Sequence, residues 1–311
     1  MRYRVHYEFN RACGQACAYC YNRFDRRPAA DSKMDARLEE YIMKLPGVEG
    51  VDVYLTGGEP LLEWPRLKNL LLRLKGLRNK QNRLFLFSSL RGAGTPFFRF
   101  TREQDVVLLI NADSADLEQA CRRGLRDIPS SRRILTHVLG RGRGSLVDRF
   151  KAWRRLGFRD VRIKLPYAPD GLDRLLNKPE QARLFSLIDE AQAACLSRIS
   201  RGALTAESSA LLSLFAQDIV LLSKGSVPCP PCRAGINYFM AGDGNVFPCL
   251  KLSTPKVVAK GGRGHPCATG KLEKKLKVRL RSGAKQLLSA IDKAGLSLGI
   301  IEKIAAASPF C

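Results

Sequence analysis

The chain has 311 residues, of which 45% are hydrophobic, so it is long enough to bury one large core or the cores of two domains. It has 53 basic and 29 acidic residues, and the formal net charge of +24 favours either solvated basic faces or a polyanionic partner such as RNA or an acidic peptide. The sequence has no apolar run as long as a membrane span and no secretion signal, so we expect a cytoplasmic protein.

The first half of the chain alternates between short apolar runs and amphipathic segments. Buried parallel strands are nearly continuous apolar runs, whereas helices carry apolar residues every three or four positions. These patterns predict a parallel α/β sheet. The strands are expected at 2–9, 51–55, 83–87, 106–110, 134–138 and 161–165, and helices at 32–45, 65–76, 114–126 and 145–157.

Several local signals refine these elements. Ser32, Ser114 and Ser145 stand where helices would begin, and serine is a preferred N-cap. The segment 97–100 interleaves aromatic and basic residues as nucleic-acid binders do, but we interpret it as a core-facing loop before the fourth strand. Farther on, helical spacing of apolar residues predicts two more helices, within 184–191 and 211–222.

Three cysteines follow the first predicted strand within eight residues: Cys13, Cys17 and Cys20, with the aromatic Tyr19 directly before the last. A [4Fe–4S] cluster usually takes four cysteines, so three would leave one iron open. An open metal position is a place for a substrate or cosubstrate. The spacing therefore indicates chemistry, although a zinc knuckle or a reactive thiol loop has the same composition.

A second motif follows the second predicted strand, and consists of Gly57, Gly58, Glu59 and Pro60. Two glycines let the backbone approach a ligand closely, and the proline stiffens the exit from the turn. Because the carboxyl ends of parallel strands meet at one edge, this motif is expected at the same face as the cysteines.

In their order and spacing these two motifs resemble those of the radical S-adenosylmethionine (radical SAM) enzymes. The resemblance implies a partial (β/α)6 TIM barrel with a small C-terminal α+β iron–sulfur extension. It also implies that Cys13, Cys17 and Cys20 hold a [4Fe–4S] cluster, that its open iron chelates the methionine end of S-adenosylmethionine, and that the Gly-Gly-Glu-Pro motif contacts the amino group of this cosubstrate.

Polar residues after the third and fourth strands extend this candidate site. Ser88 follows the third strand, and Asn111 and Asp113 follow the fourth, where members of the family place polar residues near the ribose. Asp113 could equally be a helix cap. His137 lies in an apolar strand and is interpreted as structural. The residues expected to bind the cosubstrate are Tyr19, Gly57, Gly58, Glu59, Pro60, Ser88, Asn111 and Asp113.

The C-terminal segment carries a second group of cysteines, Cys229, Cys232 and Cys249, around a hairpin turn at 243–244. It resembles the SPASM and twitch extensions of radical SAM enzymes, which implies one auxiliary [4Fe–4S] cluster. The fourth ligand is then Cys267 or Cys311. A zinc ribbon fits the same cysteines. The remaining two, Cys121 and Cys195, read as buried small apolar residues.

We therefore expect a radical SAM barrel at 1–200, a linking helix at 201–225 and an auxiliary cluster domain at 226–311. The resemblance implies reductive cleavage of S-adenosylmethionine to a 5′-deoxyadenosyl radical that abstracts hydrogen from a peptide or protein, with an external electron donor. Modification of RNA or of a nucleotide-derived small molecule is the alternative within this chemistry. A non-catalytic, zinc-stabilised RNA-binding protein is the alternative outside it.

Overall fold

The computed structural model describes residues 2–15, 20, 30–45, 50–77, 81–113, 116–140, 144–166, 176–202, 210–224, 237–247 and 271–307. The chain divides into two compact units. The first consists of Met1–Ile134 with Pro231–Pro266, and the second of Leu135–Pro230 with Cys267–Cys311. The domain boundary expected near residue 225 lies outside the described residues, and the domain limits at 200 and 225 stay predictions.

The first unit is built on a mainly parallel sheet. Its strands are β1 (Tyr3–Asn10), β2 (Val51–Gly57), β3 (Arg83–Ser88) and β4 (Val107–Asn111), which pair in parallel in this order. The four apolar runs predicted as strands in this part of the chain are thus strands, each within two residues of its expected bounds. Their carboxyl ends, where chemistry is expected, lie at one edge of the sheet.

A hairpin from far along the chain completes this sheet. Strand β7 (Asn237–Met240) pairs in parallel with the free edge of β1, and β8 (Val246–Phe247) pairs antiparallel with β7. The predicted hairpin at 243–244 is confirmed. Its attachment to β1 is a finding that the sequence did not indicate, because pairing over such a separation leaves no local pattern.

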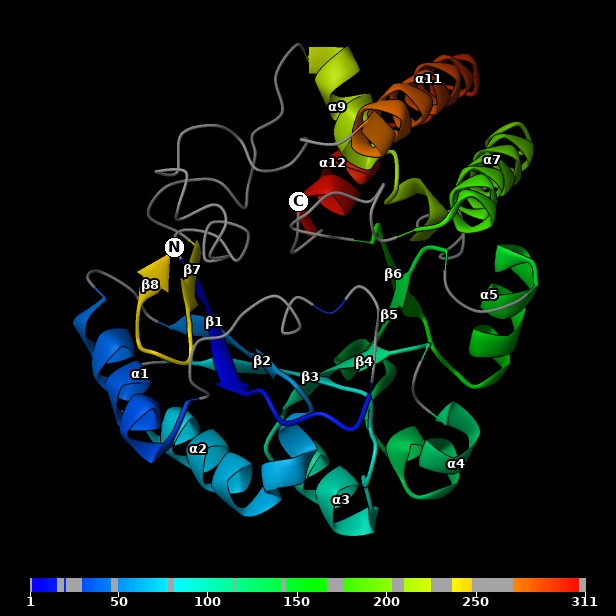
Figure 1. The fold of residues 1–311 in the computed structure, drawn as a ribbon. Helices are drawn as coiled ribbons and strands as arrows, with labels where there is room; N and C mark the ends of the chain where they lie inside the picture. Colours follow the sequence, from blue (N-terminus) through cyan, green and yellow to red (C-terminus); the bar gives the residue numbers. More distant parts are fainter. Residues whose placement is uncertain are drawn as a thin grey trace. The chain divides into compact units, whose positions relative to one another are not determined.

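Helices cover one face of the first unit's sheet (Figure 1). They are α1 (Ser32–Lys44), α2 (Trp64–Gly76) after the 3₁₀ turn η2 (Pro60–Glu63), α3 (Thr95–Glu103) and α4 (Leu117–Arg122), with the short 3₁₀ turns η3 (Leu125–Asp127) and η4 (Ser130–Arg132). The buried side of α2 is a leucine stripe at helical spacing, formed by Leu67, Leu70, Leu71 and Leu74.

The other face of the sheet carries an aromatic row. The rings of His6 and Tyr54 stack at 4.5 Å between centroids, and those of Tyr54 and Phe85 at 4.3 Å. Side chains alternate along a strand, so Glu8 and Thr56 belong to this same face, nearer the carboxyl ends of β1 and β2. Aromatic side chains thus fill the middle of this face, and polar groups lie at the carboxyl ends of β1 and β2.

The described residues of the second unit form two strands and several helices. Strands β5 (Arg133–Val138, whose first two residues belong to the first unit) and β6 (Asp160–Lys164) are neighbours, and the Leu139 N–H donates to the Lys164 carbonyl at 2.7 Å. The helices are α5 (Leu146–Arg155), α7 (Lys178–Ile199), α9 (Ala216–Lys224), α11 (Lys271–Lys293) and α12 (Leu298–Ala307). Helix α11 packs on α7 and α9, and α12 packs on α9 (Figure 1).

Two of the three predicted helix caps are wrong. Asp31, and not Ser32, caps α1, because its carboxylate accepts the N–H groups of Lys33 and Met34 at 2.9 and 3.0 Å. The helix expected from residue 114 begins instead at Leu117, with the Asp116 carboxylate as its cap. Serine and aspartate are about equally favoured as N-caps, so the residue type alone does not decide which of two candidates caps the helix. Ser145 does cap α5.

The segment 97–100 is helical and not a loop, since it lies inside α3. Phe97, Phe98 and Phe100 are buried, so the prediction that this segment faces the core is confirmed. Cys121 and Cys195 are buried as expected, at 5% and 0% exposure. Among the described helices, none combines the length and the apolarity that crossing a membrane requires.

Candidate active site

The predicted cluster-binding cysteines follow β1 directly. Cys13 is exposed and Cys20 is half-buried, whereas Cys17 and Tyr19 lie outside the described residues. All the cysteines expected to hold an auxiliary cluster also lie outside the described residues: Cys229, Cys232, Cys249, Cys267 and Cys311.

The Gly-Gly-Glu-Pro motif is hydrogen-bonded to the start of the cysteine loop. The Gly58 N–H donates to the Asn10 carbonyl at 2.8 Å, and the Glu59 N–H donates to the Ala12 carbonyl at 2.7 Å. A Cβ atom added at Gly58 would lie 2.2 Å from the Ala12 carbonyl oxygen. Glycine is therefore required here because two backbone segments touch. The structure brings together two motifs that the sequence placed only at the same edge.

The Glu59 side chain joins this junction to the loop after β3. It is 2% exposed, and one of its carboxylate oxygens accepts the Ser88 hydroxyl at 2.8 Å and the Leu61 N–H at 3.2 Å. The other oxygen accepts the Ser89 N–H at 2.7 Å and the Ser89 hydroxyl. Four protein donors thus occupy the carboxylate, so Glu59 holds the loops after β2 and β3 in one arrangement.

Asn10 is a residue of this junction that sequence reasoning missed. It is fully buried, and its Nδ2 donates to the Glu59 carbonyl at 3.1 Å. Its Oδ1 is buried and meets no donor among the described residues. A buried acceptor left over beside the cysteine loop suits a ligand that brings N–H or O–H groups. The position of Asn10 at the end of β1, directly before the cysteine loop, is the feature of the sequence that could have identified it.

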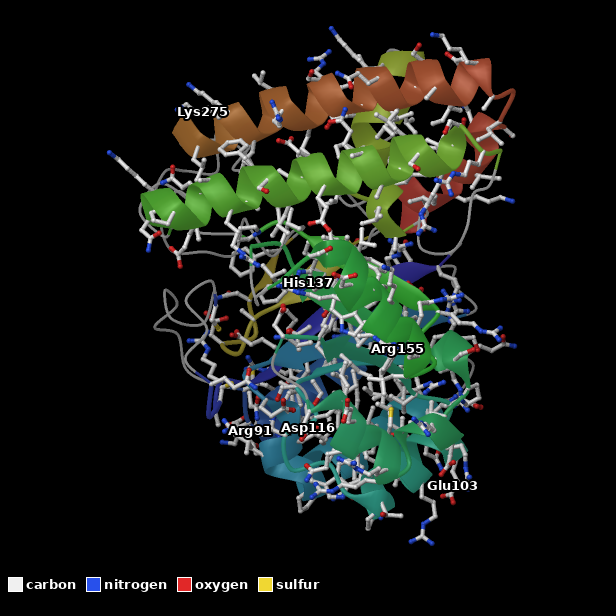
Figure 2. The ribbon with its side chains drawn as sticks, turned by 90° about the vertical axis from the view of Figure 1, so that its right-hand side faces the viewer. Arg91, Glu103, Asp116, His137, Arg155 and Lys275 are labelled. Carbon is white, nitrogen blue, oxygen red and sulfur yellow. The ribbon has the colours of Figure 1, made fainter. Side chains whose placement is uncertain are left out.

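Two arginines, Arg91 and Arg11, hold the start of the cysteine loop in place. Arg91, which follows β3, donates to the Gly14 carbonyl at 2.7 Å (Figure 2 labels Arg91). Arg11 makes two hydrogen bonds of 3.1 Å to the buried carboxylate of Glu8, which also accepts the Gly242 N–H of the β7–β8 turn at 3.0 Å. The loop is therefore supported by β1, by the β3 loop and by the C-terminal hairpin.

On the helix-covered face, Arg66 of α2 holds the backbone just before α1 in place. Arg66 donates to the carbonyls of Ala30 and Asp31 at 2.9 and 3.1 Å, and its guanidinium lies 4.2 Å from the centre of the Phe9 ring. It also contacts both oxygens of Asp35, at 2.7 and 2.8 Å. Burial and the Asp35 carboxylate raise the pKa of the Tyr7 hydroxyl, which donates to Asp35.

The remaining predicted residues lie in local structures. The Asp113 N–H donates to the Asn111 side chain at 3.1 Å in the turn that ends β4, and α4 takes Asp116 as its cap, so Asp113 is not that cap. Their contact with a ribose stays a prediction. His137 packs against Trp153 with ring centroids 5.4 Å apart, as expected of a structural residue.

Lys164, at the carboxyl end of β6, is a second residue that sequence reasoning missed. The Leu139–Lys164 hydrogen bond puts Ile163 on the same face as His137, so Lys164 belongs to the opposite face. His137 packs on α5, so Lys164 points to the side of these strands that α5 does not cover. Burial, with Arg162 nearby, lowers the pKa of Lys164 to about 7.

This lowered pKa predicts how stability changes with pH. The unfolded chain binds a proton at Lys164 up to about pH 10.5, whereas the folded chain releases it near pH 7. The protonated Lys164 side chain therefore lowers the free energy of unfolding fully below pH 7. This destabilisation disappears as the pH rises toward 10.5. Lys164→Met is expected to raise the free energy of unfolding by roughly 3 kcal/mol at pH 7. Urea unfolding of both proteins at pH 7 and 9.5 checks this, since the gain must shrink at the higher pH.

Comparison with known proteins agrees with this architecture. Residues 3–111 match the family described as the 4Fe-4S single cluster domain. No curated protein sequence matches the chain. Among solved structures, native anSMEcpe with bound AdoMet and a Cp18Cys peptide superimposes with a TM-score of 0.62 at 13% identity, over 95% of this chain and 99% of that one.

A second solved structure is SuiB of Streptococcus suis bound to its precursor peptide SuiA. The TM-score is 0.50 at 13% identity, over 91% of this chain and 66% of that one. At such identities the likeness concerns the fold, and it confirms the expected open parallel α/β architecture of a partial TIM barrel. The matched 4Fe-4S cluster domain and the shared fold agree with the resemblance of the cysteine and Gly-Gly-Glu-Pro motifs to those of the radical SAM enzymes.

Proposed function

We propose that this chain is a radical SAM enzyme that modifies a peptide or protein. The observation that carries the proposal is the junction of the cysteine loop with the buried Glu59. There the backbone of Gly58 and Glu59 is bonded to Asn10 and Ala12, and Asn10 keeps an acceptor for a ligand. A purely structural zinc loop needs no such junction.

The residues present fit an iron–sulfur cluster and its cosubstrate. Cys13, Cys17 and Cys20 would hold the cluster and leave one iron open. When bound, the cluster supplies the electron that cleaves S-adenosylmethionine to the 5′-deoxyadenosyl radical that abstracts a substrate hydrogen. The chain's own part is to position: Arg91 and Arg11 fix the cysteine loop, and the Asn10 Oδ1 can accept a donor of the cosubstrate.

The class of substrate is inferred from the relatives in fold. The solved structures named above contain a Cp18Cys peptide in one case and the precursor peptide SuiA in the other. We extend this class to the present chain, together with an auxiliary [4Fe–4S] cluster on Cys229, Cys232 and Cys249 and a fourth cysteine, Cys267 or Cys311. An external reductant would deliver the electron.

The proposal is tested by anaerobic reconstitution with iron and sulfide, followed by dithionite and S-adenosylmethionine and quantification of 5′-deoxyadenosine. We expect formation by the wild type and none by Cys13→Ala, whereas Cys195→Ala, a cysteine buried in α7, keeps the activity. Transfer of deuterium from labelled peptides into 5′-deoxyadenosine then identifies the substrate. Equal product from Cys13→Ala and wild type would rule out this cluster site.

A further inference from the structure

Helix α11 has a buried side that fixes its orientation in the second unit. Leu272, Leu276, Leu280, Leu287 and Ile291 are buried at helical spacing, and the helix packs on α7 and α9. A Cβ added at Gly283 would lie 2.8 Å from a side-chain atom of Gln192 in α7, so these two helices are in close contact. The opposite side of α11 is therefore the side that faces solvent.

From Lys274 to Lys285, most exposed residues on that solvent side are basic. The α11 basic face consists of Lys274, Lys275, Lys277, Val278, Arg281 and Lys285, all of which are exposed. Figure 2 shows Lys275 extending from the free side of the helix near its N-terminal end. Lys274, Arg281 and Lys285 lie with Val278 in one row along the helix, at intervals of three or four residues. Their charges are therefore close to one another.

The charges of this face are compensated only in part by the described residues. The helix has eight basic and two acidic residues, and Arg279, beside the face, pairs with Asp189 of α7 at 2.6 Å. None of the five basic side chains of the face forms an ion pair with a described residue, although Asp218 acts on Lys277 and Arg281 electrostatically. Like charges at these spacings destabilise a helix, so folding does not account for them.

The chemistry of the face favours a peptide over a nucleic acid. Val278, 71% exposed, places an aliphatic side chain in the middle of the basic residues. An acidic peptide offers both carboxylates and an aliphatic side chain to match it. Binders of single-stranded nucleic acid add aromatic side chains on which bases stack, and α11 has no aromatic residue.

We propose that the α11 basic face binds an acidic segment of the peptide or protein substrate, with Val278 contacting an aliphatic side chain of that segment. The inference rests on the proposed function for the identity of its partner. It assigns α11 a role in holding the substrate and no role in the chemistry. Such a contact would raise affinity without taking part in the chemistry.

The test measures binding by fluorescence anisotropy with a labelled peptide of repeating Glu-Glu-Leu, and with its Gln-Gln-Leu counterpart. We expect Lys274→Glu/Lys277→Glu/Arg281→Glu to weaken binding of the acidic peptide roughly tenfold at low salt. The control, Arg99→Glu/Arg122→Glu/Arg126→Glu, makes the same change of charge at exposed arginines of the first unit and should bind within about twofold of wild type. Val278→Ser should weaken binding of the acidic peptide about two- to fivefold.

Two outcomes would overturn the inference. Equal losses in the α11 variant and the control would mean that only net charge matters, and tighter α11-dependent binding of a single-stranded oligonucleotide would mean a nucleic-acid site. Formation of 5′-deoxyadenosine without peptide should be unchanged in the α11 variants. If the wild type forms none, the proposed function fails while the binding result stands by itself.

Discussion

Replacing Glu59 by glutamine is expected to lower the rate of 5′-deoxyadenosine formation about 10- to 100-fold, because groups that hold cluster ligands in place contribute at this level. The carboxylate accepts four donors, two from each of its oxygens. An amide has one acceptor oxygen, and its NH₂ group would face the N–H and hydroxyl of Ser89. The loop after β3, which carries Arg91, would then be held less firmly to the loop after β2.

The measurement compares Glu59→Gln with Glu103→Gln, in which the same change is made at the exposed end of α3 (Figure 2). The control should keep wild-type rates. Iron content and the ultraviolet–visible spectrum of both variants distinguish loss of the cluster from loss of cosubstrate cleavage. A Glu59→Gln protein that forms 5′-deoxyadenosine at the wild-type rate would show that the junction does not support the site.

Replacing Arg66 by methionine is expected to lower the free energy of unfolding by about 3 kcal/mol, at the low end of the range for breaking a buried ion pair because Arg66 is 20% exposed. The Asp35 carboxylate, 1% exposed, would lose its charged partner and, among the described side chains, keep the Tyr7 hydroxyl. The carbonyls of Ala30 and Asp31 would also lose a donor. Chemical denaturation at neutral pH measures the change.

The control is Arg73→Met, also in α2. Arg73 pairs with Glu39 of α1 at 2.7 Å, but it is 47% exposed, so its loss should cost at most about 1 kcal/mol. Both arginines join α2 to α1, and the comparison isolates the effect of burial. A result in which the two variants lose the same free energy would mean that the Asp35 carboxylate finds water or another partner.

The features that the sequence predicts well are those with a local physical cause. The run at 106–110 reads as a strand because both of its faces are buried, and β4 occupies it nearly to the residue. The two motifs could be placed at one face because parallel strands end together. The leucine stripe of α2 likewise follows from its own spacing.

What the sequence did not show depends on contacts between distant segments. The hydrogen bonds from Arg91 to Gly14 and from Gly242 to Glu8 join residues that nothing local connects. The segment 97–100 was misread because three phenylalanines in four residues break the simple helical period. Helices α11 and α12 were missed although α11 has a regular leucine spacing, because the cysteines before it drew the interpretation toward a small α+β extension.

The pairing of β7 with β1 bears on how the chain reaches its fold. Strand β1 is made first, yet its second edge is satisfied only by Asn237–Met240, more than two hundred residues later. Until then β1 presents unpaired N–H and carbonyl groups, an edge on which other chains can add strands. Contacts of such long range also slow folding. During synthesis the protein therefore passes through a long interval in which one edge of β1 is open to aggregation.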